Sequence, residues 1–232
     1  MKVLIIGDGK MGRAIAQLAR ERGHEVAAVL GAADNPRGGW LTRDRTAGID
    51  VALEFTEPES ARDNIAACLQ CRIPVVTGTT GWYAALPVME QEVQRLDGAL
   101  FWAPNFSLGV ALAIEVVRAA GALFATHPHF DAHIVETHHA AKKDAPSGTG
   151  AALARAAGDA MGRDVPVTSV RVGHVPGTHT LVLDAPFEQI TITHEARDRR
   201  VFADGALRAA EWLVGRRGTF TMRDLLTAPE AR

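Results

Sequence analysis

The feature that most constrains the fold is an alternation of short apolar runs and helical patterns in the first half of the chain. The expected strands cover residues 2–6, 25–30, 51–55, 73–77 and 99–102. This alternation is typical of βαβ units and of a parallel sheet that is buried on both faces. Each run ends at a loop rich in Gly, Thr, Pro or Asn, and in such a sheet these loops form the ligand crevice.

A glycine-rich loop, Gly7-Asp-Gly-Lys-Met-Gly12, follows the first expected strand and opens the first helix. In this context a G-x-G-x-x-G pattern indicates dinucleotide binding. The first glycine permits the turn, the second lets the backbone approach a pyrophosphate, and the third lets helix and strand pack closely. We therefore expect an α/β fold whose N-terminal Rossmann-type domain binds a nicotinamide or flavin dinucleotide.

The choice between NADH and NADPH depends on the end of the second strand, where a carboxylate favours a free ribose hydroxyl and a cation favours a 2′-phosphate. Here the strand runs into Gly31-Ala-Ala-Asp34, and Asp34 lies late, beyond the end of the strand, for a carboxylate that binds the ribose. Lys10 and Arg13 are near enough to the loop to meet a phosphate, but they are equally well explained as solvated cations. Both cofactors remain open.

The helix expected after the third strand carries a signal at each end. Thr56 and Glu59 predict a capping box with Pro58 in the first turn, and the helix should run to about residue 70. At its far end Cys68 and Cys71 form C-x-x-C. No second cysteine pair exists, and a thioredoxin-type motif lies at a helix start, so we expect neither a redox nor a metal function.

After Asn105 the pattern changes. A long apolar helix is expected at residues 108–124 and another at 149–161, with strands at 132–137, 168–172, 179–183 and 189–193. Strands in succession predict a second α+β domain on an open, mostly antiparallel or mixed sheet. The final helix, whose candidate buried residues are Leu207, Ala210, Trp212 and Leu213, should return to the first domain. The expected division is 1–106 with 205–232, and 107–204 for substrate binding and oligomerisation.

Composition and net charge disfavour some classes of binding partner. The net charge is −2, which disfavours proteins that coat nucleic acid or an anionic membrane. The longest apolar stretch, Leu108–Val117, is too short to span a bilayer and contains Glu115. The first residues run directly into a strand pattern. We expect a cytoplasmic protein that acts on small molecules and binds neither nucleic acid nor membrane.

The segment from Glu136 to Thr149 concentrates reactive residue types: two adjacent histidines, two adjacent lysines and a Ser-Gly-Thr that opens a helix. Histidine suits proton transfer near neutral pH, and a lysine beside other cations could also deliver a proton. His138 and His139 should face opposite sides of a strand. Backbone N–H groups of Ser147-Gly-Thr149 could hold a carboxylate. The combination suggests a small anionic substrate.

Simpler interpretations of this segment stay open. One histidine pair can arise by chance among nine histidines, the lysines could form a solvated turn, and Ser147 could be only an N-cap. A metal site is a further alternative, but no ordered carboxylate or Cys set accompanies the histidines, so we expect no metal. The histidines in question are His127, His129, His133, His138 and His139.

Taken together, these stretches resemble the 4-hydroxy-tetrahydrodipicolinate reductase family, also called dihydrodipicolinate reductases. In its active-site signature a His-His pair, a Lys and Asp-Ala-Pro-Ser-Gly-Thr follow a strand, as they do here. Other similar stretches lie at residues 7–13, 55–59, 76–81, 103–107, 190–196 and 202–206, with Trp212. The resemblance covers nearly the whole chain.

The resemblance implies hydride transfer from NADH or NADPH to a cyclic imine dicarboxylate, with loss of water, in lysine and diaminopimelate biosynthesis. It implies His138 as the general acid/base and Lys142 as proton donor, with His139, Ser147, Gly148 and Thr149 binding the substrate. The implied cofactor residues are Gly7, Asp8, Gly9, Lys10, Met11, Gly12, Arg13, Phe55, Gly78, Thr79, Thr80, Ala103, Pro104, Asn105 and Phe106. Family members are generally homotetramers joined through the second-domain sheets, and a homodimer is the alternative.

Two departures from the family pattern concern the cofactor: the glycine loop is one residue shorter than the common form, and residues 31–50 lack a clear ribose-binding carboxylate.

Two rival functions are a related two-domain amino-acid or semialdehyde dehydrogenase and a non-catalytic nicotinamide-binding sensor. His138 and Lys142, followed by Asp-Ala-Pro-Ser-Gly-Thr, favour the reductase over both.

Overall fold

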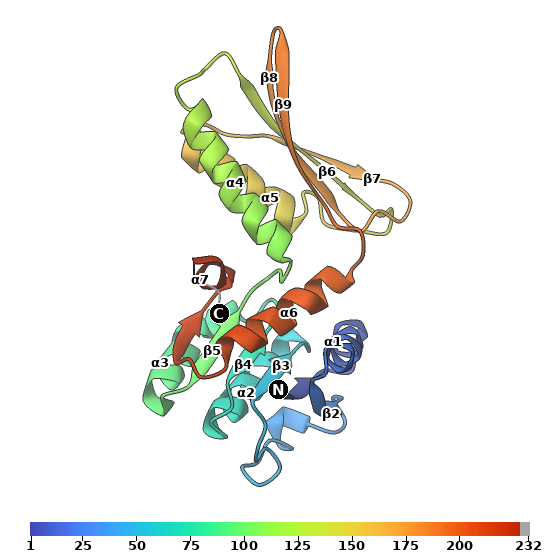
Figure 1. Cartoon of the computed structure of the whole chain (residues 1–232), viewed down its shortest axis with the longest axis vertical. Coiled ribbons are helices and arrows are strands. Elements are labelled where there is room, and N and C mark those ends of the chain that lie inside the picture. Colours follow the sequence, from blue (N-terminus) through green and yellow to red (C-terminus); the bar gives the residue numbers. More distant parts are fainter. Residues whose placement is uncertain (228–232) are drawn as a thin grey trace. The chain divides into compact units, whose positions relative to one another are not determined.

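The structure is a computed structural model that describes residues 1–227, and it divides into two compact units (Figure 1). Unit 1 comprises Met1–Phe106 and, of the described residues, those from Phe202 to Thr227, and unit 2 comprises Ser107–Val201. Residues 228–232 of the expected C-terminal segment lie outside the described residues. The chain re-enters unit 1 at Phe202, inside the first turn of a helix, and not at the expected residue 205. Within residues 1–227, no helix is both long and apolar enough to cross a membrane.

Unit 1 is built on a six-stranded sheet in the order β10-β5-β4-β3-β1-β2, with every neighbouring pair parallel. Its strands are β1 (Lys2–Ile6), β2 (Glu25–Leu30), β3 (Val51–Glu54), β4 (Val75–Thr77), β5 (Ala99–Trp102) and β10 (Gly218–Phe220). The prediction of a parallel, Rossmann-type sheet is confirmed. β10 was not expected, because three residues carry no alternation that distinguishes a strand from a loop.

Helices cover both faces of this sheet. They are α1 (Lys10–Glu21), α2 (Pro58–Gln70), α3 (Leu86–Leu96), α6 (Arg200–Leu213) and the short α7 (Met222–Thr227), with single 3₁₀ turns at Pro36–Gly38 and Tyr83–Ala85. Leu4 and Leu100 face a core that includes Ile65 of α2 and Met89 of α3. On the other face Phe101 contacts Trp212 of α6, with ring centroids 6.0 Å apart. This two-sided cover explains why the strands read as continuous apolar runs.

The start of α2 differs from the prediction. Its N-cap is Glu57, with no side-chain hydrogen bond, and Pro58 occupies the first turn. The Thr56 hydroxyl instead donates to the buried carboxylate of Glu54. The expected capping box is therefore wrong, because a buried carboxylate needs donors more than a helix end near solvent does.

Unit 2 is a four-stranded sheet with two helices on one face (Figure 1). Its elements are α4 (Leu108–Phe124), β6 (Asp131–His138), α5 (Gly148–Met161), β7 (Val167–Arg171), β8 (Thr178–Ala185) and β9 (Glu188–Glu195). The strand order is β7-β6-β8-β9, with β6 and β7 parallel and the other pairs antiparallel, so the expected mixed sheet is confirmed. Val117 of α4 and Ala157 of α5 pack with Ile134 and Leu181 of the sheet.

Candidate active site

The loop between β1 and α1 has the geometry that its glycines predicted. Gly7 has a φ of 112°, and a Cβ there would lie 2.1 Å from the backbone oxygen of Phe55. A Cβ on Gly12 would lie 1.8 Å from the Gly7 oxygen, so helix and strand could not pack with a larger residue. Gly9 has no atom within 4 Å of its Cβ position. The loop is thus closed on the protein side and open where a pyrophosphate would approach the N-terminus of α1.

A cavity of about 300 Å³ adjoins this loop at the carboxyl ends of β1, β2 and β3. Its lining includes Ile6, Gly7, Asp8, Gly9, Leu30, Gly31, Ala32, Asn35, Pro36, Arg37, Phe55, Thr56, Glu57, Ser60 and Asn64. Gly7, Asp8, Gly9 and Phe55, which the resemblance assigns to the cofactor, thus line one cavity. Lys10, Met11, Gly12 and Arg13 form the first turn of α1 beside it, and Arg13 Nε donates to the Asp8 backbone oxygen at 2.6 Å. A glycine turn, a helix N-terminus and a cavity fit one end of a dinucleotide.

The loops after β3 and β4 are joined by a buried carboxylate. Glu54 is fully buried and accepts hydrogen bonds from the hydroxyls of Thr56, of Thr77 at 2.5 Å and of Thr79 at 3.1 Å. Thr79 also accepts the backbone N–H of Thr56 at 2.8 Å. These bonds fix the carboxyl edge of the sheet. This role could not be predicted from the sequence, where Glu54 is a single polar residue in an apolar strand.

The remaining predicted cofactor residues follow β4 and β5 at the same edge. Thr79, Ala103 and Phe106 are buried, and the Phe106 ring packs on Phe55 with centroids 5.5 Å apart. Gly78 has no room for a side chain, because its Cβ would lie 2.1 Å from the Phe55 ring. The loops also carry Thr80, Pro104 and Asn105. Contact of these loops with a cofactor stays a prediction.

Cys68 of the C-x-x-C pair is not a reactive thiolate. Cys68 is fully buried and unbridged, and burial raises the pKa of its thiol. Cys71 is also unbridged and donates to the Leu41 backbone oxygen at 3.4 Å. A buried thiol of raised pKa is chemically inert at neutral pH, which agrees with a packing role.

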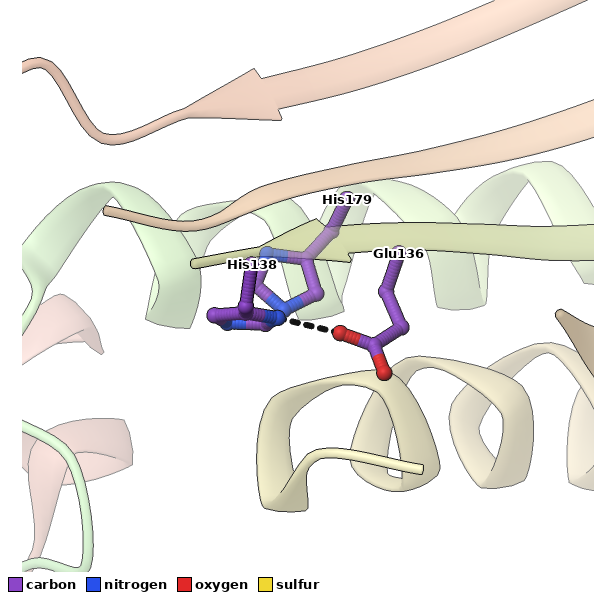
Figure 2. Close-up of side chains that lie close together, drawn as sticks. All are labelled: Glu136, His138 and His179. Carbon is purple, nitrogen blue, oxygen red and sulfur yellow. Dashed lines mark hydrogen bonds and ion pairs between the residues drawn. The ribbon is translucent and has the colours of Figure 1, made fainter. Parts of the chain in front are cut away.

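In unit 2, three buried titratable side chains converge: Glu136 and His138 of β6 and His179 of β8 (Figure 2). Glu136 and His138 are two residues apart, so they project from the same face of the strand. The antiparallel register places His179 directly opposite Glu136. His138 Nδ1 is hydrogen-bonded to Glu136 Oε2. The segment that the sequence singled out therefore contains a carboxylate–histidine pair.

Glu136 is held as an anion inside the protein. Its Oε1 accepts from Arg171 Nη2 at 2.7 Å and from the Ser147 backbone N–H at 3.2 Å. Burial acts to raise the pKa of Glu136, but the bonds from Arg171, Ser169, Ser147 and His138 outweigh it and lower the pKa to about 2. A carboxylate with this many donors stays ionised at any pH the protein meets.

His138 is arranged to exchange a proton through one nitrogen. Desolvation lowers its pKa, although the Glu136 carboxylate opposes that shift, so the ring is neutral near pH 7. Because Nδ1 faces a carboxylate, we assign the proton to Nδ1, which leaves the lone pair on Nε2. Nε2 has no hydrogen-bond partner among residues 1–227. A Cβ on Gly177 would lie 3.0 Å from it, so glycine there keeps this nitrogen uncovered.

His179 completes the cluster as a neutral ring. Its centroid is 5.0 Å from that of His138 in an edge-to-face arrangement, and its Nε2 lies 3.3 Å from Ser147 Oγ. Burial, together with the neighbouring His138, lowers the pKa of His179 to about 4. Glu136, His138 and His179 are close enough to hold a metal ion. Arg171 already neutralises the carboxylate, however, so we interpret the cluster as a proton-transfer site.

The other predicted substrate residues lie around this cluster. His139 is half-buried just past the end of β6, and Lys142 Nζ pairs with both carboxylate oxygens of Asp144 at 2.7 and 2.9 Å. Ser147 is buried and caps α5 by accepting the Gly150 N–H at 3.0 Å, so its hydroxyl is used within the protein. Gly148 is exposed and Thr149 is half-buried in the first turn of α5.

Three features of the site were not predicted from the sequence. They are the role of Glu136, the presence of His179 in the cluster, and the ion pair of Arg171 with Glu136. Glu136 could have been found, because a carboxylate two residues before a histidine in a strand lies on the same face. Arg171 and His179 could not, since only the pairing of β6 with β7 and β8 brings them there.

Comparisons with known proteins agree along the chain. The family model described as dihydrodipicolinate reductase, N-terminus, matches residues 1–106, and that described as the C-terminus matches residues 109–226. Two proteins named 4-hydroxy-tetrahydrodipicolinate reductase are similar. The one from Christiangramia forsetii is 34% identical and covers 98% of each chain, and the one from Xanthomonas campestris is 39% identical and covers 97% of this chain and 98% of its own.

Solved structures show the same fold. A dipicolinate-bound dihydrodipicolinate reductase from Paenisporosarcina sp. TG-14 matches with a TM-score of 0.81 and 22% identity, over 95% of this chain and 97% of its own. A probable dehydrogenase from Thermotoga maritima matches with a TM-score of 0.59 and 11% identity, over 97% and 92%.

Proposed function

Because this chain belongs to the dihydrodipicolinate reductase family, we propose that it reduces 4-hydroxy-tetrahydrodipicolinate to tetrahydrodipicolinate with NADH or NADPH, in lysine and diaminopimelate biosynthesis. The observation that carries the proposal is the Glu136–His138 pair, which leaves Nε2 of His138 uncovered and which contacts the start of α5 through the Ser147 N–H. When bound, the nicotinamide cofactor supplies the hydride.

His138 is the general acid/base of the proposal. Glu136 holds its Nδ1–H, which fixes the ring and keeps Nε2 as the atom that takes up or returns a proton. Arg171 keeps Glu136 ionised, so the carboxylate orients the ring and does not compete for the proton. The buried, neutral His179 packs against His138 and limits its rotation.

Lys142 is the proposed proton donor at the reduced substrate. Its side chain is half-buried and its Nζ pairs with both oxygens of Asp144, which holds the ammonium in place, and the third N–H of the ammonium can serve a substrate. The exposed Gly148 and the half-buried Thr149 start α5, where N–H groups and the helix dipole favour a substrate carboxylate. His139 is assigned a substrate contact.

In unit 1 the proposed dinucleotide lies along Gly7–Arg13, with its pyrophosphate at the N-terminus of α1 and one end in the cavity beside Phe55. The loops at residues 78–80 and 103–106 are assigned to the nicotinamide end, since they follow neighbouring strands at the same carboxyl edge. Glu54 and its three threonine partners set the positions of the first of these loops.

The test is an assay with enzymatically generated hydroxy-tetrahydrodipicolinate, in which the absorbance of NADH and NADPH is followed separately. We expect oxidation of at least one cofactor. His138→Ala and Lys142→Ala should each lower kcat by about 10²-fold or more, as expected for lost acid–base groups. No turnover by folded protein with either cofactor would contradict the reductase function.

Lys143→Ala is the matched control for Lys142→Ala, because Lys143 is the adjacent, exposed lysine. It should retain the wild-type rate. If His138→Ala and Lys142→Ala also retained that rate, the site assignment would fail while the reductase function stood.

Assembly and location complete the proposal. Val172 and Ile190, near the two edges of the unit 2 sheet, are 52% and 41% exposed, and Phe187 in the β8–β9 turn is fully exposed. Apolar side chains of this size in solvent favour association through the sheet, as a homotetramer or homodimer. Light scattering on the purified protein distinguishes these states from a monomer.

The proposed location is the cytoplasm. Two unbridged cysteines suit this reducing compartment, and cell fractionation tests the location.

A further inference from the structure

We propose that Asp8, a residue of the glycine loop, supplies the ribose-binding carboxylate that the end of β2 lacks, and that it makes this protein prefer NADH over NADPH. The inference rests on the proposed dinucleotide site and adds a cofactor preference to it. In most Rossmann domains the carboxylate that binds the adenosine ribose comes from the end of the second strand. Here that position is Gly31.

The geometry at Gly31 carries the inference. A Cβ built on Gly31 would lie 3.1 Å from both Cγ and Oδ2 of Asp8 and 3.3 Å from Oδ2 of Asp34. The Asp8 carboxylate therefore lies where a side chain at position 31 would begin. Gly31 provides the space that Asp8 fills, and both residues line the same cavity.

The two carboxylates beside Gly31, those of Asp8 and Asp34, differ in their hydrogen-bond partners. Asp34 Oδ2 accepts the Gly31 backbone N–H at 3.0 Å, so Asp34 stabilises the turn after β2, and it does not line the cavity. The side chain of Asp8 is exposed and accepts no hydrogen bond from residues 1–227. Its oxygens remain available to accept the 2′- and 3′-hydroxyls of a ribose.

The charge at this position determines the preference. A ribose hydroxyl donates to a carboxylate, whereas a 2′-phosphate meets the negative charges of Asp8 and Asp34 within a few ångströms. The opposing group is Arg37, which also lines the cavity and could pair with a phosphate. Asp8, Asp34 and Arg37 are all exposed, so water screens all three charges, but the two carboxylates are the groups nearest to the Gly31 position at the end of β2.

The test measures dissociation constants of NADH and NADPH for the full-length protein by calorimetry or by the fluorescence of the reduced nicotinamide, so it does not depend on turnover. The wild type should bind NADH more tightly. Asp8→Asn removes the charge at constant shape and should shift the NADH-to-NADPH affinity ratio toward NADPH by about tenfold, as expected for one charged hydrogen bond. Glu59→Gln removes the same charge from the exposed start of α2 and should leave the ratio unchanged.

A swap tests the placement of the carboxylate. In Asp8→Ala with Gly31→Asp the carboxylate returns to the end of β2, and preference for NADH should recover relative to Asp8→Ala alone. A wild type that prefers NADPH, with Arg37→Gln abolishing that preference and Asp8→Asn leaving it unchanged, would overturn the inference. Binding of neither dinucleotide to the wild type would instead contradict the proposed cofactor site.

Discussion

Among residues 1–227 two glutamates are completely buried, one in each unit, and they have different partners. Glu54 in unit 1 is bonded by the hydroxyls of three threonines, all near the carboxyl edge of the parallel sheet. Glu136 in unit 2 is bonded by a guanidinium, a backbone N–H and a histidine. Glu54 joins loops, whereas Glu136 sets the proton state of a ring. Burial alone therefore does not separate a structural carboxylate from one proposed to act in catalysis, and the titratable partner is the feature that distinguishes Glu136.

The largest effect should come from Glu136→Gln. The amide cannot balance the charge of Arg171 or fix the Nδ1–H tautomer of His138, so kcat should fall by about a hundredfold, within the range of general acid–base catalysis. Steady-state kinetics at saturating cofactor measure the change. A structural role alone would lower the melting temperature and leave the pH profile of kcat in place; a profile unchanged from the wild type would therefore remove Glu136 from the mechanism.

The next effect concerns acid stability. The folded state holds His179 neutral with a pKa of about 4, whereas the unfolded chain takes up a proton near pH 6.5. Stability from this residue is therefore present above pH 6.5, falls as the pH drops to about 4, and amounts to about 3 kcal/mol at most. Chemical unfolding at several pH values should show a smaller loss in His179→Gln.

His133→Gln is the control for that series, because His133 lies on β6 outside the cluster and its ring contacts Thr168. It should follow the wild-type pH dependence. Equal pH dependence in all three proteins would mean that the burial of His179 does not affect acid stability.

Glu54→Gln should destabilise the protein by about 1.5 kcal/mol, because several hydroxyl donors lose a charged acceptor. The contrast with Glu136→Gln lies in the pH profile of kcat, which should keep its wild-type form because Glu54 holds loops through threonine hydroxyls and has no histidine partner. Thermal unfolding and the same kinetic assay measure both. A changed pH profile would show that Glu54 also titrates in the reaction.

The smallest effect is expected for Thr79→Val, about 1 kcal/mol, since it removes one donor to Glu54 and the acceptor of the Thr56 N–H. Thr79→Ser keeps the hydroxyl and should stay close to the wild type. Calorimetric melting of both variants checks the difference. A serine variant as unstable as the valine variant would assign the effect to the lost methyl group and not to the hydrogen bonds.

The fold class could be predicted from local sequence patterns, and so could the segment that contains the candidate site. Alternating apolar runs and helices dictate a parallel sheet, and glycines at positions 7 and 12 are the residues that fit the turn and the close contact there. The segment from Glu136 to Thr149 contains two histidines, two lysines and a helix start. These residue types are sufficient to mark it as a candidate site. These features depend on neighbours along the chain.

The contacts between side chains from distant segments, by contrast, are seen only in the folded structure. His179 and Arg171 reach Glu136 through strand pairing, 35 residues or more along the chain, and Asp8 reaches the end of β2 because Gly31 leaves room for it. Thr56 was expected to cap a helix and instead bonds Glu54. Contacts of this kind are set by the packing of distant segments, which no local pattern of residues encodes.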